Sequence, residues 1–432
     1  MKYRLLLILL TCCYPVALQA QRAKRLIRPR DVSRIEKVLA DDRMQGRRTF
    51  TPGLERASRF IENQFGVIGL DTLKTDKGYS QPFTLSFIEP KSIDLTLDQI
   101  PVPSKDVIVR SLQPRLDWTN KDSCELMIIG PGEDLFARMR TALRASQNTL
   151  VLVDSSYKER FYEVRKSLNT NNTINPLPNS TLFILHSGRP QKFAVHIANH
   201  RREESTHNIV GILPGKIFPG EFVIFSAHYD HLGIGKPIKG DSIYNGANDD
   251  ASGTTAVLEL AKYYKAAGNN ARTLIFVAFT GEEEGGYGSN YFATRINADS
   301  IVAMSNIEMI GTKSKWGSNS AYITGFDKTD FGKIIQKAVQ GTPYRFYPDP
   351  YPSQQLFYRS DNASLAKLGV PAHTISTSKM DNEPYYHQVT DDINTLDINN
   401  MTAIIRAIAQ GMTGIVAGKE TPSRLAPQSL KR

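Results

Sequence analysis

The chain has 432 residues, more than a single hydrophobic core usually supports, so a large domain with a smaller inserted or appended one is expected. Its formal net charge of +10 comes from scattered lysines and arginines, with no basic stripe carrying interleaved aromatic residues. This pattern excludes nucleic acid as an expected partner.

Residues 1–20 have the layout of a secretory signal peptide. Lys2 and Arg4 precede an apolar run that ends near Cys13, and small residues lead to a cleavage position after Ala20. The run is shorter than the about 20 residues that a membrane-spanning helix needs, and no later stretch qualifies. We therefore expect export to the periplasm or the cell exterior, without a transmembrane segment.

The cysteines bear on anchoring and on disulfides. Cys12 and Cys13 raise the possibility of a lipid anchor, but Thr11 is not the small residue usual before a lipidated cysteine, so an anchor is not favoured. Cleavage after residue 20 would leave Cys124 alone, so no intramolecular disulfide is expected. Cys124 is then expected to be a small buried hydrophobe rather than a nucleophile.

Residues 32–90 are predicted to form the N-terminal part of the main domain. In the stretch ERASRFIENQFGVIGL, the apolar residues Ala57, Ile61 and Phe65 recur at helical spacing. This spacing predicts an amphipathic helix that ends near Gly69.

Residues 91–201 differ in character from what precedes them. Short β-rich runs are separated by proline, asparagine and serine; they read SIDLTLD, ELMIIG, TLVLVD, STLFILH and FAVHIA. This pattern predicts a small β-containing domain inserted into the main one.

Residues 202–419 alternate between apolar strands, polar loops and helices. The runs FVIFSAH, SGTTAVLELAKYYKAAG, TLIFVAFT and IVAMSNIEMIG are examples. The alternation predicts a three-layer α/β/α sandwich whose central sheet is mixed, largely parallel and largely buried. Residues 420–432 are expected to form a C-terminal tail.

Five candidate metal ligands lie in strongly marked segments of this region. The segments SAHYDHLG, NGANDDASG, TGEEEGGYGS, SNIEMIG and YYHQVTDD contain His228, Asp249, Glu283, Glu308 and His387. Three of them follow apolar runs, and ligands of open α/β sheets bind at the carboxyl ends of strands. Two imidazoles and three carboxylates suit Zn²⁺, and one carboxylate can bridge two ions. The sequence therefore predicts a two-zinc site and hydrolysis of a peptide-like bond by a metal-held hydroxide.

Each candidate also has a purely structural interpretation. Asp249 and Asp250 could cap a helix that begins near Ser252, and the acidic run 282–284 could favour a helix N-terminus. His231 is interpreted as a structural residue, and so are the remaining histidines outside the site: His186, His196, His200, His207 and His373.

Together, the motifs resemble those of the co-catalytic di-zinc aminopeptidases, whose family also includes aminopeptidase Y, glutamate carboxypeptidases and glutaminyl cyclases. The resemblance covers residues 32–90 and 207–419 and rests on five motifs in the family's order. It implies the zinc exopeptidase fold, two Zn²⁺ ions and hydrolysis of peptides that have a free N-terminus. In some relatives a protease-associated domain occupies the place of residues 91–201.

The resemblance also assigns roles around the first zinc. His228 resembles a terminal ligand, Asp230 resembles the carboxylate that orients its imidazole, and Asp249 resembles the bridging aspartate. A cis peptide bond is implied between Asp249 and Asp250. Glu282 aligns with the general base that takes a proton from water and delivers it to the leaving amine.

Glu283 and His387 resemble the ligands of the second zinc, whereas Glu308 stands where the family usually has aspartate. Asn362 likewise stands where many relatives have histidine. These departures leave two alternatives, a glutaminyl cyclase on the same fold and a non-catalytic binding protein.

Neither side-chain specificity nor oligomeric state follows from the sequence. Tyr358 and Tyr386 are candidates for stabilising an oxyanion.

Overall fold

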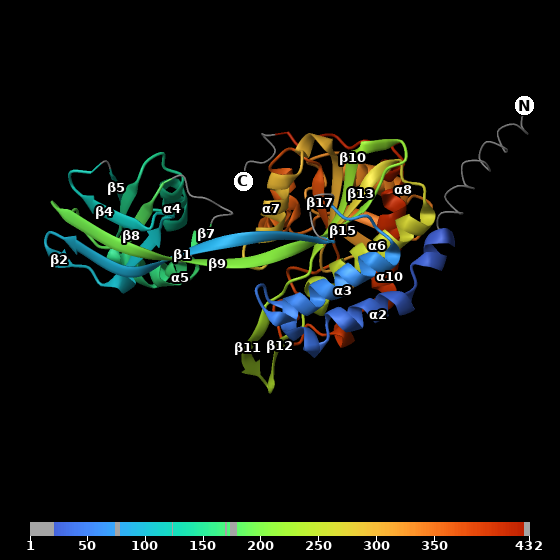
Figure 1. Ribbon diagram of the computed structural model, residues 1–432, viewed down its shortest axis with the longest axis horizontal. Coiled ribbons are helices and arrows are strands. Elements are labelled where there is room, and N and C mark those ends of the chain that lie inside the picture. The colour runs from blue at the N-terminus through green and yellow to red at the C-terminus, as the bar shows by residue number, and fades with distance from the viewer. Residues whose placement is uncertain (1–20, 74–77, 123, 169–170, 173–178, 427–432) are drawn as a thin grey trace, which may run out of the picture. The chain divides into compact units, whose positions relative to one another are not determined.

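Figure 1 shows a computed structural model, which describes residues 21–73, 78–122, 124–168, 171–172 and 179–426. The expected signal peptide and the last residues of the expected tail lie outside this part. The chain divides into two compact units, the first formed by Met1–Phe83 and Thr206–Arg432 and the second by Thr84–Ser205. In the described part of the chain, no helix combines the length and apolarity needed to cross a membrane.

The first unit is built on a mixed sheet. In spatial order its strands are β16 (Arg345–Pro348), β15 (Ser320–Ile323), β17 (Ala372–Ser376), β14 (Ile301–Ile307), β10 (Phe218–His228), β13 (Arg272–Phe279) and β9 (Phe193–Leu213). The central strands β13, β10, β14 and β17 run parallel, whereas β9 pairs antiparallel with β13 and β15 pairs antiparallel with β17. A separate hairpin consists of β11 (Gly233–Ile238) and β12 (Asp241–Tyr244).

Helices cover both faces of this sheet. One face carries α2 (Pro29–Leu39), α3 (Pro52–Ile68), α6 (Ser252–Ala267), α8 (Phe331–Ala338), α10 (Ile398–Gly411) and α11 (Thr413–Val416). The other face carries α7 (Tyr287–Arg295) and α9 (Asn362–Ala366). The predicted three-layer α/β/α architecture is therefore confirmed.

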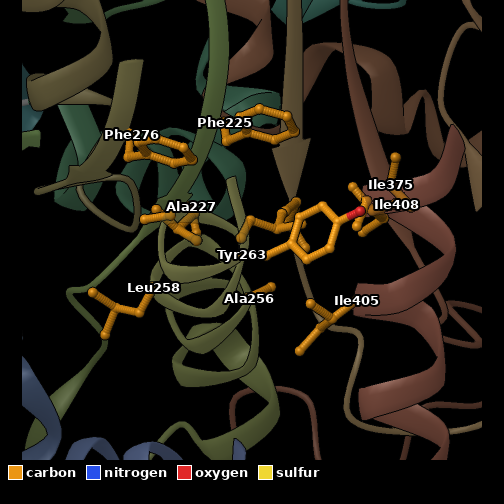
Figure 2. Packing of buried hydrophobic residues seen from close by; sticks show 14 of the residues in the cluster. Phe225, Ala227, Ala256, Leu258, Tyr263, Phe276, Ile375, Ile405 and Ile408 are labelled. Carbon is orange, nitrogen blue, oxygen red and sulfur yellow. The ribbon is translucent and has the colours of Figure 1, made fainter. Parts of the chain in front are cut away.

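The core follows from the alternation of side chains along the strands. On β10, Val223 and Phe225 enter the larger apolar cluster, whereas Ile224 between them enters the cluster on the opposite face. Figure 2 shows Phe225 and Phe276 of the sheet beside the helix α6, with Ile405 and Ile408 of the neighbouring helix α10. Because both faces are buried, the central strands are apolar throughout, as parallel sheets require.

The helix predicted to end near Gly69 is confirmed as α3. The Thr51 side chain accepts a hydrogen bond from the Leu54 amide at its start, and Pro52 occupies the first helical position. Gly69 ends the helix with φ of 76°, a left-handed conformation that favours glycine.

The second unit has its own sheet, in the order β3 (Val107–Arg110), β8 (Thr181–Leu185), β6 (Thr149–Val153) and β5 (Glu125–Ile129). Its remaining strands and helices are β2 (Ile100–Pro101), β4 (Arg115–Thr119), β7 (Asn171–Asn172), α4 (Leu135–Leu143) and α5 (Lys158–Leu168). The strand β1 (Ser80–Leu97), like β9, has residues in both units.

The two helices of the second unit were not predicted from the sequence. They are short, and α5 reads KERFYEVRKSL, so their apolar periodicity is weak. Nevertheless, Leu135, Met139 and Phe161 are buried against one face of the sheet.

Candidate metal centre

Three neighbouring strands bring the candidate residues to one edge of the sheet. His228 is the last residue of β10, Glu282 and Glu283 follow β13, and Glu308 directly follows β14. Because β13, β10 and β14 are adjacent and parallel, their carboxyl ends meet. The sheet therefore gathers these side chains as the sequence predicts.

Asp249 reaches the same place from the turn before α6. The peptide bond between Asp249 and Asp250 is cis, as the family resemblance implied. The Asp250 carboxylate accepts hydrogen bonds from the Gly253 amide at 2.9 Å and the Met309 amide at 3.0 Å. Asp250 thus caps the helix and ties the turn to the end of β14, leaving Asp249 to face the site.

Asp391 holds this turn from the side of the His387 loop. Its carboxylate accepts hydrogen bonds from the amides of Asn248 at 2.8 Å and Asp249 at 3.0 Å. Burial raises the pKa of Asp391 to about 7. The loop that carries His387 is therefore joined directly to the turn that carries Asp249.

Arg47 fastens the same loops from the N-terminal part of the chain. Its fully buried guanidinium donates hydrogen bonds to the carbonyl oxygens of Leu39, Tyr229, Asn245 and Gly246. Four backbone acceptors compensate the burial of this charge. Arg47 thereby links the segment after His228 with the segment before Asp249.

The first group of candidate ligands consists of His228, Asp249 and Glu308. One possible ligand atom from each lies within 4.8 Å of the others. The His228 Nε2 atom is 3.2 Å from Asp249 Oδ1. This group suits one metal ion.

The second group surrounds Glu283. Glu283, Asp249 and His231 also offer ligand atoms within 4.8 Å of one another. The Nε2 atom of His387 lies 3.1 Å from Glu283 Oε2 and 3.3 Å from Asp249 Oδ2. Asp249 is common to both groups, as a bridging ligand must be.

The pKa shifts in the two ligand groups indicate that positive charge among their carboxylates would be stabilising. Burial disfavours the charged form of His228, but the carboxylates of Asp249, Glu282 and Asp250 together outweigh it and raise the pKa of His228 well above its ordinary value. Burial likewise acts to raise the pKa of Asp249, yet the imidazoles of His228 and His387 beside its oxygens hold it well below its usual range. Burial raises the pKa of Glu308 to about 7.

The orphaned polar atoms fit a metal site. His228 Nε2, His387 Nε2 and Glu308 Oε2 are buried and have no hydrogen-bond partner among the described residues. Buried polar atoms without partners are costly, and ligation by a cation would compensate them. The imidazole and carboxylate donors are those that Zn²⁺ accepts.

The structure distinguishes the three consecutive glutamates. Glu282 lines the cavity beside the two groups but belongs to neither. Burial raises its pKa well above the ordinary value, and Glu308 adds to the effect. The Glu284 side chain instead pairs with Arg48 at 3.1 Å. This geometry favours Glu282 as a base and Glu283 as a ligand.

Asp230 contacts His228 differently from the expectation. The His228 Nδ1 atom lies 3.1 Å from the Asp230 carbonyl oxygen, whereas the carboxylate is 3.8 Å away. The carboxylate accepts hydrogen bonds from the amides of Glu282 at 3.2 Å and Glu283 at 3.4 Å. The backbone of Asp230 thus contacts the imidazole, and its side chain fixes the segment of the two glutamates.

The cavity over these groups has mixed walls. Besides the four carboxylates it is lined by Met309, Tyr322, Thr324, Leu356, Arg359, Ser360, Thr374, Ser376, Met380 and Tyr386. Tyr386 stacks on the His387 ring with centroids 3.9 Å apart. Tyr358 does not line the cavity, so of the two candidate oxyanion donors only Tyr386 lies at the site. Asn362 instead donates to the carbonyl oxygens of Phe357 and Ala372, which is a packing role.

Sequence reasoning missed three residues of this site. His231 was interpreted as structural, although it reaches Glu283. Arg47 and Asp391 were not singled out at all. The second histidine of HYDHLG is His231, and the first aspartate of HQVTDD is Asp391, so both lie beside a predicted ligand. Arg47 has no such sequence signal, because it contacts carbonyl groups that are distant in the chain.

Residues 208–412 match the family described as "Peptidase family M28". The chain is 29% identical over 204 residues to a "Probable leucine aminopeptidase" of Trichophyton verrucosum, a match covering 45% of this chain and 53% of that protein. "Leucine aminopeptidase 1" of Blastomyces gilchristii is 30% identical over 226 residues, covering 47% and 56% of the two chains. The chain thus spans about half the length of the curated relatives it matches.

Solved structures share the fold. An aminopeptidase from Aneurinibacillus sp. strain AM-1 superposes with a TM-score of 0.55 at 19% identity, covering 94% of this chain and 97% of that one. A zinc aminopeptidase from Bacillus subtilis gives a TM-score of 0.53 at 14% identity, covering 91% and 97%. The family resemblance is therefore confirmed by the match of residues 208–412 to the peptidase family M28.

Proposed function

We propose that the chain is an exported, zinc-dependent aminopeptidase that holds two zinc ions and removes N-terminal residues from peptides. One observation carries the proposal: two ligand groups share Asp249, and Glu282 lines the same cavity without belonging to either group. A metal-binding scaffold would not need this additional carboxylate. The match of residues 208–412 to a peptidase family supports the reaction class.

In this proposal His228, Asp249 and Glu308 hold one ion, and Asp249, Glu283 and His387 hold the other. When bound, such ions polarise a peptide carbonyl group and lower the pKa of water, so that attack can occur at neutral pH.

Glu282 acts as the general base and then as the general acid. Its carboxylate accepts a proton from the attacking water and delivers it to the amine that leaves as the peptide bond breaks. The Asp230 carboxylate contributes by fixing the backbone of Glu282 and Glu283. The Asp230 carboxylate therefore positions both the base, Glu282, and the proposed metal ligand, Glu283.

Tyr386 acts on the substrate in this proposal. Its ring is packed on His387 and lines the cavity, where the phenol would donate a hydrogen bond to the carbonyl oxygen on which negative charge develops. The family resemblance implies that the free N-terminus of the substrate docks near the ions, which gives exopeptidase action.

The test is an assay of purified protein with free and N-acetylated peptides and with aminoacyl chromogenic substrates, with metal analysis before and after chelation. We expect two zinc ions per chain, release of N-terminal residues and no hydrolysis of the acetylated peptides. A peptide with N-terminal glutamine belongs in the panel, because a glutaminyl cyclase would release ammonia from it. Hydrolysis within acetylated peptides would contradict the proposal.

Export has its own test. Because residues 1–20 carry the layout of a signal peptide, the protein isolated from its host should begin at Gln21. Mass spectrometry that found Met1 intact, or a lipid on Cys12 or Cys13, would overturn this part of the proposal.

A further inference from the structure

Glu283 lies between two imidazoles, one at each carboxylate oxygen. The Nδ1 atom of His231 is 2.9 Å from Oε1, and the Nε2 atom of His387 is 3.1 Å from Oε2. The two rings are 5.8 Å apart and inclined at 70°. The five family motifs assign a role to His387 but none to His231.

The two imidazoles differ in their relation to Asp249. His387 Nε2 is 3.3 Å from Asp249 Oδ2 and is therefore close to both carboxylates, as a shared ion's ligand would be. His231 Nδ1 is 4.0 Å from the same Asp249 atom, too far for a hydrogen bond, so it is close to Glu283 alone. This asymmetry favours His387 as the ligand and His231 as a residue that holds a ligand, although the His231 ring also lies within reach of a common ion.

The fold builds a closed slot for His231. Its side chain is fully buried, whereas that of His387 is 33% exposed. A Cβ atom at Gly246 would come within 2.5 Å of Cγ and Cδ2 of the His231 ring. The His231 amide also donates to the Arg47 carbonyl oxygen at 3.3 Å. The ring is therefore held in one orientation by its surroundings.

The chemistry of the contact fixes which partner donates. A carboxylate that binds a metal ion is deprotonated and can only accept a hydrogen bond. The hydrogen between His231 and Glu283 must then lie on Nδ1. Such hydrogen bonds to ligands hold their rotamers and strengthen metal binding.

We propose that His231 is a positioning residue of the metal centre: its Nδ1–H group occupies Glu283 Oε1, so that Oε2 alone is presented to the ion shared with Asp249 and His387. This inference rests on the proposed function, because it requires an ion in the second ligand group. It predicts that removing the donor weakens binding of one ion and leaves the other unchanged.

The experiment is a zinc titration of the metal-stripped full chain against a competing chelator, for the parent and two variants. His231→Leu removes the donor with a side chain of similar bulk, whereas His231→Asn retains an N–H group near the position of Nδ1. We expect His231→Leu to weaken one of the two zinc sites by about 10- to 100-fold. In His231→Asn the same site should stay within about threefold of the parent.

A matched control removes another histidine–carboxylate pair. His196 Nδ1 lies 2.9 Å from Asp117 Oδ1 in the second unit, the same separation as in the His231 pair, but on the surface. His196→Leu should leave both zinc affinities at the parent values. Thermal unfolding of each metal-free variant shows whether it is folded before zinc is added.

The outcomes distinguish this inference from the proposed function. Unchanged zinc affinities in His231→Leu would overturn the positioning role while leaving a two-zinc aminopeptidase intact. If His231→Asn were as weak as His231→Leu, the imidazole would be a direct ligand, and the positioning role would again be overturned. A parent that binds only one zinc ion would overturn the proposed metal centre and this inference together.

Discussion

The two units of the chain differ in whether they bury ionisable side chains. The first unit buries Glu36, Arg47, His228, Asp230, His231, Asp249, Asp250, Glu259, Arg272, Asp361, His373 and Asp391. Among the described residues of the second unit, no buried side chain is ionisable, and its buried polar groups are hydroxyls such as those of Ser111 and Thr149. Its ion pairs, Arg138 with Glu133 for example, lie on the surface.

This difference indicates where function is concentrated. Moving a charge from water into a protein interior costs several kcal/mol unless a partner compensates it. The second unit avoids that cost and rests on apolar clusters on both faces of its sheet. The first unit incurs it repeatedly at the ends of β10, β13 and β14, where a metal centre would compensate it.

The largest expected effect comes from Glu282→Gln. The amide cannot accept the proton of water, so kcat should fall about a hundredfold or more, the scale of general-base catalysis, while both zinc ions remain bound. Glu284→Gln is the matched control, because Glu284 pairs with Arg48 away from the ligand groups. Steady-state kinetics with metal analysis decide the matter. Near-normal turnover in Glu282→Gln would remove Glu282 from the reaction, and loss of zinc would show that it is a ligand.

Glu308→Ala should weaken binding of one zinc ion and leave the other bound. Glu308 Oε2 has no hydrogen-bond partner in the described part of the chain, whereas Glu283 is held at Oε1 by His231. The ion at His228 and Glu308 should therefore be lost first on mild chelation, and the variant should retain about one zinc with strongly reduced activity. Glu133→Ala, in the second unit, should keep both ions. Unchanged stoichiometry and activity in Glu308→Ala would show that Glu308 is not a ligand.

Chelation should affect only the first unit. An ion present at about a thousand times its dissociation constant stabilises the folded state by about 4 kcal/mol. Removing it should speed amide hydrogen exchange in the strands of the first unit while exchange in β6 and β8 stays constant. Mass spectrometry of deuterium uptake with and without chelator measures this contrast. Equal acceleration of amide hydrogen exchange in both units would contradict the conclusion that the metal centre belongs to the first unit.

A smaller effect concerns pH and a buried histidine away from the ligands. The His373 imidazole contacts the Thr324 carbonyl oxygen at 2.9 Å and the Thr329 hydroxyl at 2.7 Å. Burial lowers its pKa from 6.5 to about 4, so between these pH values the unfolded chain binds more protons than the folded one. The free energy of unfolding should therefore fall as pH drops from 6.5 to 4, by up to about 3 kcal/mol from this group.

His373→Phe tests that assignment, because phenylalanine keeps a ring against Phe331 but cannot titrate. Urea unfolding at pH 7 and pH 4.5 should show a smaller loss in the variant than in the parent. His196→Phe, at an exposed position in the second unit, should behave like the parent. Identical acid sensitivity of His373→Phe and the parent would mean that His373 does not contribute.

The sequence predicted much of the site because its residues are adjacent to strand ends. His228, Glu283 and Glu308 follow apolar runs, so the architecture and the meeting of these side chains followed from local pattern. The role of Arg47 could not be predicted, since its acceptors are backbone carbonyl groups far away in the chain.

The direction of the His231 ring could not be predicted for a different reason. A histidine beside a ligand motif has no sequence feature that separates a structural imidazole from one directed at a carboxylate. Only the slot beside Gly246 determines where its ring points. The helices of the second unit were missed because their polar composition hides the few apolar residues they bury.

The central claim is that two ions sharing Asp249 support removal of N-terminal residues. The most direct measurement is a titration of metal-stripped protein with zinc while release of an N-terminal residue is followed. We predict no activity without zinc and full activity at two equivalents per chain. Hydrolysis that persists after complete stripping, or that is complete at one equivalent, would contradict the account.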